Sequence, residues 1–273
     1  MAADVVTNAA ERRRWNDEYW ASVWPRREQL TGAVTDLLLR HLDLIAGERV
    51  LDVGSGGGTT SVAAARLIGN AGSVVGADIS VPLVERATRR AREEGLANVR
   101  FVVADAQHET IAAEPFDAAT SQFGVMFFDE PTSAFANIRS HTVPGGRLAF
   151  ACWQPAERNL WHIGHAVGRF VEASPPPAPG RSPTGPFSLG DPDRTAGVLA
   201  AAGWSTIART PYELTVPVER DAIVDDAQLG FLGVADRQMD EARGAVEHHL
   251  AGLRREDGRY DAALAFQIFT ASG

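Results

Sequence analysis

A glycine-rich run from Asp52 to Gly58 is the first segment of this sequence whose residue types and spacing could bind a ligand. An apolar stretch at 49–53 precedes it and a stretch typical of a helix follows at 59–67, so the run predicts a turn from a buried strand into a helix. Glycine leaves the main chain open to a ligand and tolerates positive φ. Open α/β sheets bind ligands at the carboxyl ends of their strands. Alone, the run predicts a nucleotide-like ligand.

Two more carboxylates end the next two predicted strands. Asp78 follows the strand expected at 73–77 and lies 20 residues beyond Gly58, a spacing at which a carboxylate binds ribose hydroxyls. Ser80 is the expected N-cap of the following helix, which leaves Asp78 available for a ligand. Asp105 ends the third strand in the same way. Three strands that end in Asp at one edge favour a binding site over turn chemistry alone.

Two residues of the first turn discriminate between nucleotide ligands. The dinucleotide fingerprint Gly-x-Gly-x-x-Gly requires glycine where this chain has Thr59. Asp52 would repel a pyrophosphate, whereas it would attract an ammonium group. S-adenosylmethionine carries an ammonium, a sulfonium, a ribose and an adenine without a phosphate, and it fits better than NAD(P). An NAD(P)-dependent oxidoreductase is the alternative, and a non-catalytic cofactor-binding protein is a third hypothesis.

The elements that must position these residues alternate between strand and helix, the pattern of an α/β protein with a parallel sheet covered on both faces. Upstream, residues 10–42 predict one or two amphipathic helices that carry Trp15, Tyr19, Trp20 and Trp24. Downstream, the pattern predicts a helix at 193–202, a strand near 206–216, helices to about 255 and a last strand at 262–270. The earlier strands are expected at 49–53, 73–77, 99–103, 116–120 and 147–153, and the helices at 59–67, 81–94 and 131–141.

The expected fold is therefore a doubly wound, seven-stranded, mostly parallel sheet of Rossmann-like type, with an N-terminal helical cap and a C-terminal helical insertion. Within one compact domain, residues 1–42 form the cap and 43–153 the cofactor-binding core. Residues 154–192 form a substrate-side helix and a loop, because 174–190 holds six prolines and three glycines. Residues 193–273 complete the sheet and carry the insertion.

Four motifs follow one another at the ends of the predicted strands: Val50 to Gly56, Gly76 to Ser80, Ala104-Asp105-Ala106 and Phe116-Asp117-Ala118. Together they resemble the successive motifs of class I S-adenosylmethionine-dependent methyltransferases, in particular the ubiquinone/menaquinone-biosynthesis-type (type 11) group. The resemblance is strong over 47–153 and weak over 15–30. It implies a methyltransferase that acts on a small molecule, aromatic or of secondary metabolism.

The resemblance also implies how the first two motifs hold S-adenosylmethionine. Gly54 and Gly56 would line its methionine portion, while Asp52 would order the loop or bind the amino group through water. Asp78 would hold the ribose hydroxyls, and Ile79 would pack on the adenine.

The later motifs would complete the cofactor site. Asp105 would accept the adenine amino group, with Ala106 supplying main chain, and Ser121, Gln122 and Phe123 would face the sulfonium and the substrate. Relatives tend to carry arginine where Gln122 stands, so a charge-based role at that position is in doubt. The expected cofactor residues are Asp52, Gly54, Ser55, Gly56, Asp78, Ile79, Asp105, Ala106, Ser121, Phe123 and Trp20.

Methyl transfer is an in-line displacement in which positioning supplies much of the rate, and a base is needed only when the acceptor must lose a proton. His162 and His165 follow the fifth strand and, three residues apart, would share a helix face. They are the candidate catalytic bases, with Tyr19 as a further candidate. Solvated histidines without a role are the simpler interpretation, just as the tryptophans of the cap could only pack it onto the sheet. No His/Asp/Glu cluster has metal-ligand spacing.

Composition limits the partners. All 26 basic residues are arginine, so lysine chemistry is excluded, and the net charge of -9 argues against nucleic acid. The single cysteine, Cys152, cannot form an intramolecular disulfide. No apolar run is long enough to span a membrane and no signal peptide is apparent, so we expect a cytoplasmic protein. A homodimer is compatible with the sequence.

Overall fold

A seven-stranded sheet of order β3-β2-β1-β4-β5-β7-β6 organises the computed structural model, which describes residues 8–171 and 184–273. β1 to β5 pair in parallel, and β7 runs antiparallel to both of its neighbours. The expected doubly wound, mostly parallel sheet is thus confirmed. The strands are β1 (Arg49–Val53), β2 (Ser73–Asp78), β3 (Val99–Val103), β4 (Phe116–Gln122), β5 (Thr142–Trp153), β6 (Ser205–Val218) and β7 (Tyr260–Ser272).

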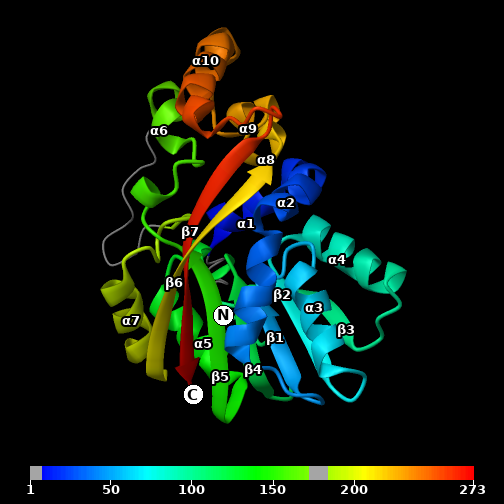
Figure 1. Cartoon of the computed structure of the whole chain (residues 1–273). Coiled ribbons are helices and arrows are strands. Elements are labelled where there is room, and N and C mark those ends of the chain that lie inside the picture. Colours follow the sequence, from blue (N-terminus) through cyan, green and yellow to red (C-terminus); the bar gives the residue numbers. More distant parts are fainter. Residues whose placement is uncertain (1–7, 172–183) are drawn as a thin grey trace, which may run out of the picture.

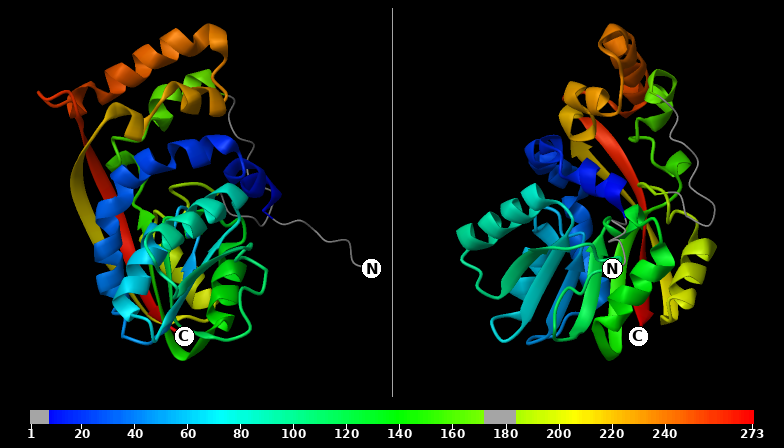
Figure 2. Two further views of the ribbon diagram at one scale, coloured as in Figure 1. Left: turned by 90° about the vertical axis from the view of Figure 1, so that its right-hand side faces the viewer. Right: turned by 180° about the vertical axis from the view of Figure 1, so that it is seen from behind.

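Helices cover both faces of the sheet, as short apolar strands buried on two sides require. On one face α2 contacts both α3 and α4, and on the other α5 and α7 pair (Figures 1 and 2). The core therefore lies in two layers, one on each side of β1, β4 and β5. These helices are α2 (Glu18–Leu42), α3 (Thr59–Ile68), α4 (Val81–Glu93), α5 (Pro131–Ser140) and α7 (Pro192–Ala201).

The N-terminal cap consists of α1 (Ala9–Trp15) and the first half of α2. The Asp17 side chain caps α2 by accepting a hydrogen bond from the Tyr19 main-chain N–H, and Pro25 lies inside the helix. Proline interrupts the helical hydrogen bonds and bends a helix, and Figure 2 shows α2 bent, with its first half across the strand ends. Further on, Val34, Leu38 and Leu42 are buried at intervals of four residues, which fixes the second half against the sheet.

A second helical layer lies above the carboxyl ends of the parallel strands (Figure 1). It comprises the segment between β6 and β7 together with a short helix after β5, and α2 contacts α8 and α9. This is the expected C-terminal insertion. Its helices are α8 (Arg220–Ile223), α9 (Asp226–Phe231) and α10 (Met239–Leu250), joined by α6 (Gly164–Val167) from the chain after β5.

β5 begins earlier than expected. The sequence Pro144-Gly145-Gly146 predicts a turn before a strand at 147–153, but Thr142 already pairs with Phe116. The register shifts before Ala118 pairs with Arg147, and Gly145 has a φ of 77°. The turn is therefore an irregularity inside the strand, because main-chain pairing with β4 continues on both sides of it.

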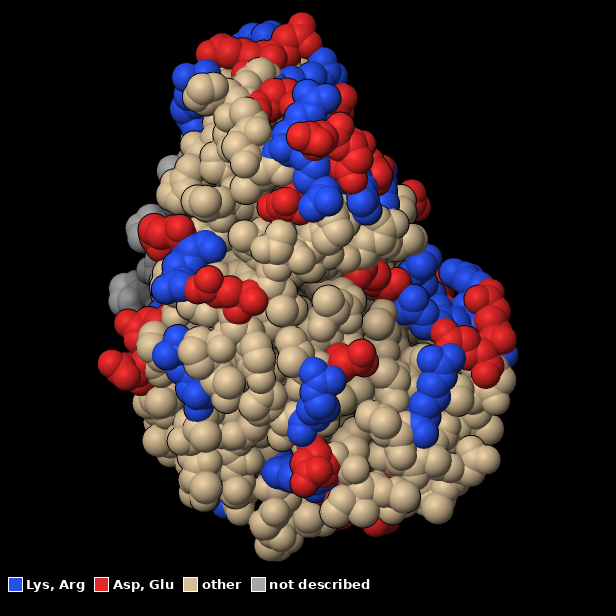
Figure 3. All heavy atoms as spheres, viewed as in Figure 1, with Lys and Arg blue, Asp and Glu red and all other residues tan. Residues whose placement is uncertain are grey.

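Part of one expected segment lies outside the described residues, and several other expectations are not tested by the structure. The proline-rich segment is described only from residue 184 onward. In the part of the chain that the structure describes, no helix is both long and apolar enough to cross a membrane. Basic and acidic side chains alternate over the upper part of the face in Figure 3. The four-part division of the chain, the cytoplasmic location and a homodimer stay predictions.

The ends of β1 and β4 approach each other through glycine. A Cβ built on Gly124 would lie 2.8 Å from the Cα of Gly54 and 2.8 Å from the carbonyl oxygen of Val53, closer than real Cβ atoms come. From the other side, a Cβ built on Gly54 would lie 2.7 Å from the Cα of Gly124. No side chain fits between the two strand ends.

We expect Gly124→Ala to lower the free energy of unfolding by about 1–3 kcal/mol, the usual cost of overpacking. The control Gly197→Ala, at an exposed position of α7 where a Cβ meets nothing within 4 Å, should stabilise by about 0.5–1 kcal/mol. Urea unfolding measures both. Equal effects of the two substitutions would contradict the close approach.

Candidate active site

A cavity of about 430 Å³ lies at the carboxyl ends of β1, β2 and β4, beneath the two helical layers. One half is lined by the glycine-rich turn and by the residues that follow β2 and β3. The other half is lined by aromatic and apolar side chains of β5, the segment after it and α9. Lining residues of the first half include Gly54, Ser55, Gly57, Asp78, Ile79 and Ala106, and those of the second Phe123, Trp153, Trp161, His162, Val167 and Leu232.

The glycine-rich turn is held open by main-chain contacts with β2. The N–H groups of Gly54 and Ser55 both donate to the Ala77 carbonyl, at 2.8 and 3.1 Å. Gly54, Gly56 and Gly58 have positive φ of 66°, 52° and 86°, which explains why glycine is needed there. The Ser55 hydroxyl is buried and has no hydrogen-bond partner among the described residues. A polar ligand in the cavity would satisfy it.

Asp78 lines the cavity but is already engaged by the main chain. Its Oδ2 accepts from the Gly56 N–H at 2.8 Å and its Oδ1 from the Ser80 N–H at 2.9 Å. Ser80 is the N-cap of α4 as expected, yet it does not leave Asp78 free, because the carboxylate also holds the turn together. A carboxylate has about four lone-pair sites, so two remain for ribose hydroxyls. Burial raises the pKa of Asp78 above its usual value.

Asp52 lies beneath the turn instead of in the cavity lining. Its Oδ2 accepts from the Ser61 hydroxyl at 2.5 Å, and its Oδ1 has no partner within the described ranges. Burial, together with the nearby charge of Asp78, raises the pKa of Asp52 to about 7. Of the two roles expected for Asp52, the contact with Ser61 favours the ordering of the turn and of α3. The direct attraction of a ligand ammonium has no contact to support it.

Asp105 also lies outside the cavity lining. It is buried, and its Oδ1 accepts from the Gln107 main-chain N–H at 3.0 Å, which closes the turn after β3. Ala104 and Ala106 line the cavity on either side of it. Contact of the Asp105 carboxylate with an adenine amino group stays a prediction, whereas Ile79 and Ala106 are placed where a flat ring would pack.

The end of β4 contributes a strained residue. Phe123 has a φ of 62°, which is unusual for a residue other than glycine and costs roughly 1–3 kcal/mol. Its ring stacks on Trp153, with centroids 4.0 Å apart and planes 11° from parallel. The Ser121 hydroxyl is buried and accepts from the Gly124 N–H at 3.2 Å, so Ser121 supports the turn from outside the cavity. This conformation places the Phe123 ring in the second half of the cavity lining, against Trp153.

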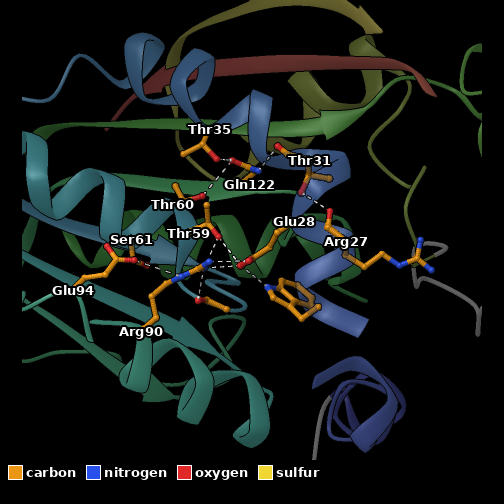
Figure 4. Close-up of polar contacts among 12 residues, drawn as sticks. Arg27, Glu28, Thr31, Thr35, Thr59, Thr60, Ser61, Arg90, Glu94 and Gln122 are labelled. Carbon is orange, nitrogen blue, oxygen red and sulfur yellow. Dashed lines mark hydrogen bonds and ion pairs between the residues drawn. The ribbon is translucent and has the colours of Figure 1, made fainter. Parts of the chain in front are cut away.

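Gln122 is fixed by residues of two helices, α2 and α3, as Figure 4 shows. Its Oε1 accepts from the hydroxyls of Thr35 at 2.8 Å and Thr60 at 3.3 Å, and its Nε2 donates to the Thr31 carbonyl at 3.0 Å. An arginine at this position would leave the two hydroxyls without their acceptor, because a guanidinium cannot accept a hydrogen bond.

A network that sequence reasoning missed ties the cap to the turn (Figure 4). Glu28 of α2 forms an ion pair with Arg90 of α4 at 2.6 Å and accepts from the Thr59 hydroxyl at 2.6 Å. Arg90 also donates to the Gly57 carbonyl at 2.9 Å. In the sequence, Arg90 belongs to an alternating run of basic and acidic residues typical of a solvated face, and its partner stands 62 positions away. No local signal could identify the pair.

The aromatic residues of the cap have different roles. Trp24 packs directly on the turn, where a Cβ on Gly56 would lie 2.2 Å from its ring. Trp20 lines the cavity, and its buried Nε1 has no hydrogen-bond partner within residues 8–171 and 184–273. Tyr19 stacks on Phe231 outside the lining, and its hydroxyl lies 3.4 Å from an Asp225 carboxylate oxygen. The geometry thus favours Trp20 as a ligand contact and argues against Tyr19 as a base.

The two candidate histidines are separated. His162 precedes α6 and lines the cavity, whereas His165 is exposed in a shallow hollow beside Glu241 and His248. The expected shared helix face is wrong, because α6 begins only at Gly164. Burial lowers the pKa of His162 to about 4. Of the pair, only His162 can reach a ligand in this cavity.

The raised pKa of Asp52 predicts a pH-dependent stability. Because the folded-state pKa of about 7 exceeds the usual 3.8, the folded state binds the proton more tightly, and stability falls as pH rises between these values. Asp52→Asn removes the buried charge, so it should raise the Tm above that of the parent at pH 8 and much less at pH 5. Thermal unfolding at both pH values measures this. Exposed Asp36→Asn is the control, and a pH-independent effect of Asp52→Asn would contradict the assignment.

Comparison with known proteins identifies the core of the site. A family profile described as "Methyltransferase domain" matches residues 50–146. Aklanonic acid methyltransferase DauC of Streptomyces sp. strain C5 is 37% identical over 39% of this chain and 48% of the relative. Nocamycin O-methyltransferase of Saccharothrix syringae is 31% identical over 64% and 66%, and the ubiquinone/menaquinone biosynthesis C-methyltransferase UbiE of a Marinomonas species 32% over 48% and 54%.

The matched regions span between 48% and 66% of the length of these three relatives. Among solved structures, the YcgJ protein of Bacillus subtilis superposes with a TM-score of 0.59 at 17% identity, over 88% of this chain and 98% of the other. That likeness supports the fold, and the motif-bearing match at 50–146 covers the glycine-rich turn, Asp78 and Asp105. The matches identify residues 50–146 as a methyltransferase domain of the class I, S-adenosylmethionine-dependent type.

Proposed function

We propose that this protein transfers a methyl group from S-adenosylmethionine to a small-molecule acceptor. The observation that carries the proposal is the single cavity in which the glycine-rich turn and Asp78 line one half while stacked aromatic rings and His162 line the other. A methyl donor and an acceptor could occupy it together. The curated relatives named after aklanonic acid and nocamycin support an acceptor from secondary metabolism.

The residues of the first half fit S-adenosylmethionine. The turn from Gly54 to Gly57 offers main chain without side chains to the methionine portion, and the unpartnered Ser55 hydroxyl offers a hydrogen bond there. Asp78 has lone pairs left for the ribose hydroxyls, and Ile79 with Ala106 forms an apolar surface for the adenine. Among the described residues, Arg90 donates to the Gly57 carbonyl of the turn, and its charge is neutralised by Glu28.

The second half of the cavity would orient the acceptor. When bound, S-adenosylmethionine supplies a methyl carbon activated by its sulfonium. The stacked pair Phe123 and Trp153 would hold a flat acceptor against that carbon, while Trp20 and Val167 exclude water. In-line geometry of this kind can supply roughly 7–11 kcal/mol of the barrier lowering. Because the sulfonium already activates the methyl carbon, positioning of the two reactants would supply much of the catalysis.

Binding of S-adenosylhomocysteine tests the cofactor half. We expect isothermal titration calorimetry to show a 1:1 complex, and Asp78→Ala to weaken it at least about tenfold, because hydrogen bonds from hydroxyls to a charged group contribute strongly. Asp78→Asn keeps one acceptor oxygen and should lose less. Asp36→Ala, at an exposed position of α2, is the control and should bind like the parent.

Two outcomes would contradict the proposal. S-adenosylhomocysteine could fail to bind the parent protein, or NADH could bind more tightly than S-adenosylhomocysteine in the same titration. The second result would favour an oxidoreductase. Binding that is retained in full by both Asp78 variants would leave the methyl donor in place but would remove the assigned role of Asp78.

A further inference from the structure

The His162 ring is held rigidly at the wall of the cavity. It packs edge-on against Phe187, with ring centroids 4.7 Å apart and planes at 89°, and edge-on against Trp161. Its carbonyl accepts a hydrogen bond from His249 Nε2 at 3.1 Å. A Cβ on Gly164 would lie 2.6 Å from His162 Cε1. Glycine at 164 therefore allows the ring to lie against the main chain.

The main chain determines which ring nitrogen carries the proton. The Gly164 N–H donates to His162 Nδ1 at 3.2 Å. A main-chain amide can only donate, so Nδ1 must be unprotonated and accept. In a neutral imidazole one nitrogen is a donor and the other an acceptor, so the proton stays on Nε2. Burial, followed by the smaller effects of His165, His249 and Arg27, lowers the pKa of His162 and keeps the ring neutral near pH 7.

A cation lines the same half of the cavity. Arg27 of α2 donates from Nη1 to the carbonyls of Ala222 and Ile223 at 3.1 and 2.7 Å and from Nη2 to Gln228 Oε1. Within the described ranges no ion pair joins Arg27 to a carboxylate. The carboxylate next to it in the sequence, Glu28, is paired with Arg90 instead. The other charged groups among the described lining residues are Arg14 of α1, Glu28, which is paired with Arg90, and Asp78 at the cofactor end. The acceptor half is thus lined by a neutral donor and an uncompensated positive charge.

We propose that His162 is a hydrogen-bond donor that recognises an anionic oxygen of the methyl acceptor beside Arg27, and that it is not the general base expected from the sequence. This inference rests on the proposed methyltransferase function and narrows its substrate class to molecules that carry a carboxylate, a phenolate or an enolate. An unprotonated Nδ1 occupied by a main-chain amide cannot take a proton from the acceptor, and Nε2 already holds one.

The methyl transfer then balances without a base. The acceptor enters with its oxygen already ionised, its proton having been lost to water. A lone pair of the acceptor forms the new bond to the methyl carbon, while the bond between carbon and sulfur breaks and its electron pair returns to sulfur. His162 Nε2–H stays bonded to the acceptor oxygen or to an oxygen next to it, and orients the molecule throughout.

Matched probes test the inference. Calorimetry in the presence of S-adenosylhomocysteine compares 2-naphthoate with 2-naphthamide, which have the same shape and differ in charge. In the parent protein we expect 2-naphthoate to bind about tenfold more tightly, as a charge-assisted hydrogen bond predicts. His162→Gln keeps an N–H donor without basicity and should preserve the preference within about threefold. His162→Phe should abolish it.

A second variant leaves the imidazole in place. Gly164→Ala would displace the ring by steric contact and should abolish the preference as His162→Phe does. Exposed His248→Gln on α10 is the matched control and should behave like the parent. Each variant is first shown to bind S-adenosylhomocysteine as the parent does, which separates loss of the donor from loss of folding.

The outcomes distinguish the inference from the proposed function. Equal affinity for the two probes, no binding of 2-naphthoate, or the same loss in His162→Gln as in His162→Phe would overturn the donor role while the methyltransferase proposal stands. Failure of the parent protein to bind S-adenosylhomocysteine would instead overturn the proposed function itself.

Discussion

The close approach of the main chain at the ends of β1 and β4 is the constraint on which the site depends. Gly54 and Gly124 face each other at a distance that admits no Cβ on either residue. The strand order changes direction at this point, between β1 and β4, and open α/β sheets place their ligands there. Because no side chain fills the gap, the cavity can extend from one half to the other.

Buried carboxylates and a strained residue in and around the turn lower the stability of the fold, and a binding function would explain why they are present. Asp52 is buried with one oxygen unpartnered in the described part of the chain, and Asp78 accepts from one main-chain amide of the turn and from one at the start of α4. Burial raises the pKa of both carboxylates, and the charge of Asp78 raises the pKa of Asp52 further, so a fold selected only for stability would replace them. Phe123 adds backbone strain. Such concentrations of strain and buried charge are typical of functional sites.

The two helical layers convert this sheet edge into an enclosed site. Glu28 and Arg90 connect α2 with α4 directly above the turn, and Trp24 packs on the glycines themselves. The layer after β6 supplies the contacts that orient Arg27. The cavity is therefore built by segments from both ends of the chain, and the chemistry of its acceptor half depends on how the layers dock and not on any single motif.

The sequence by itself determined the alternation of strands and helices, the glycine-rich turn and the three strand-end carboxylates, and hence the fold, and it predicted the cofactor class. These features are local: period, turn residues and strand ends are set within a few positions. The tertiary structure decided the rest. It separated His162 from His165, placed Asp52 and Asp105 behind the cavity wall, engaged Asp78 with the turn, and paired Glu28 with Arg90. Those outcomes depend on contacts between residues far apart in the chain and on a main-chain amide that selects one imidazole tautomer. Neither can be predicted from a local sequence pattern.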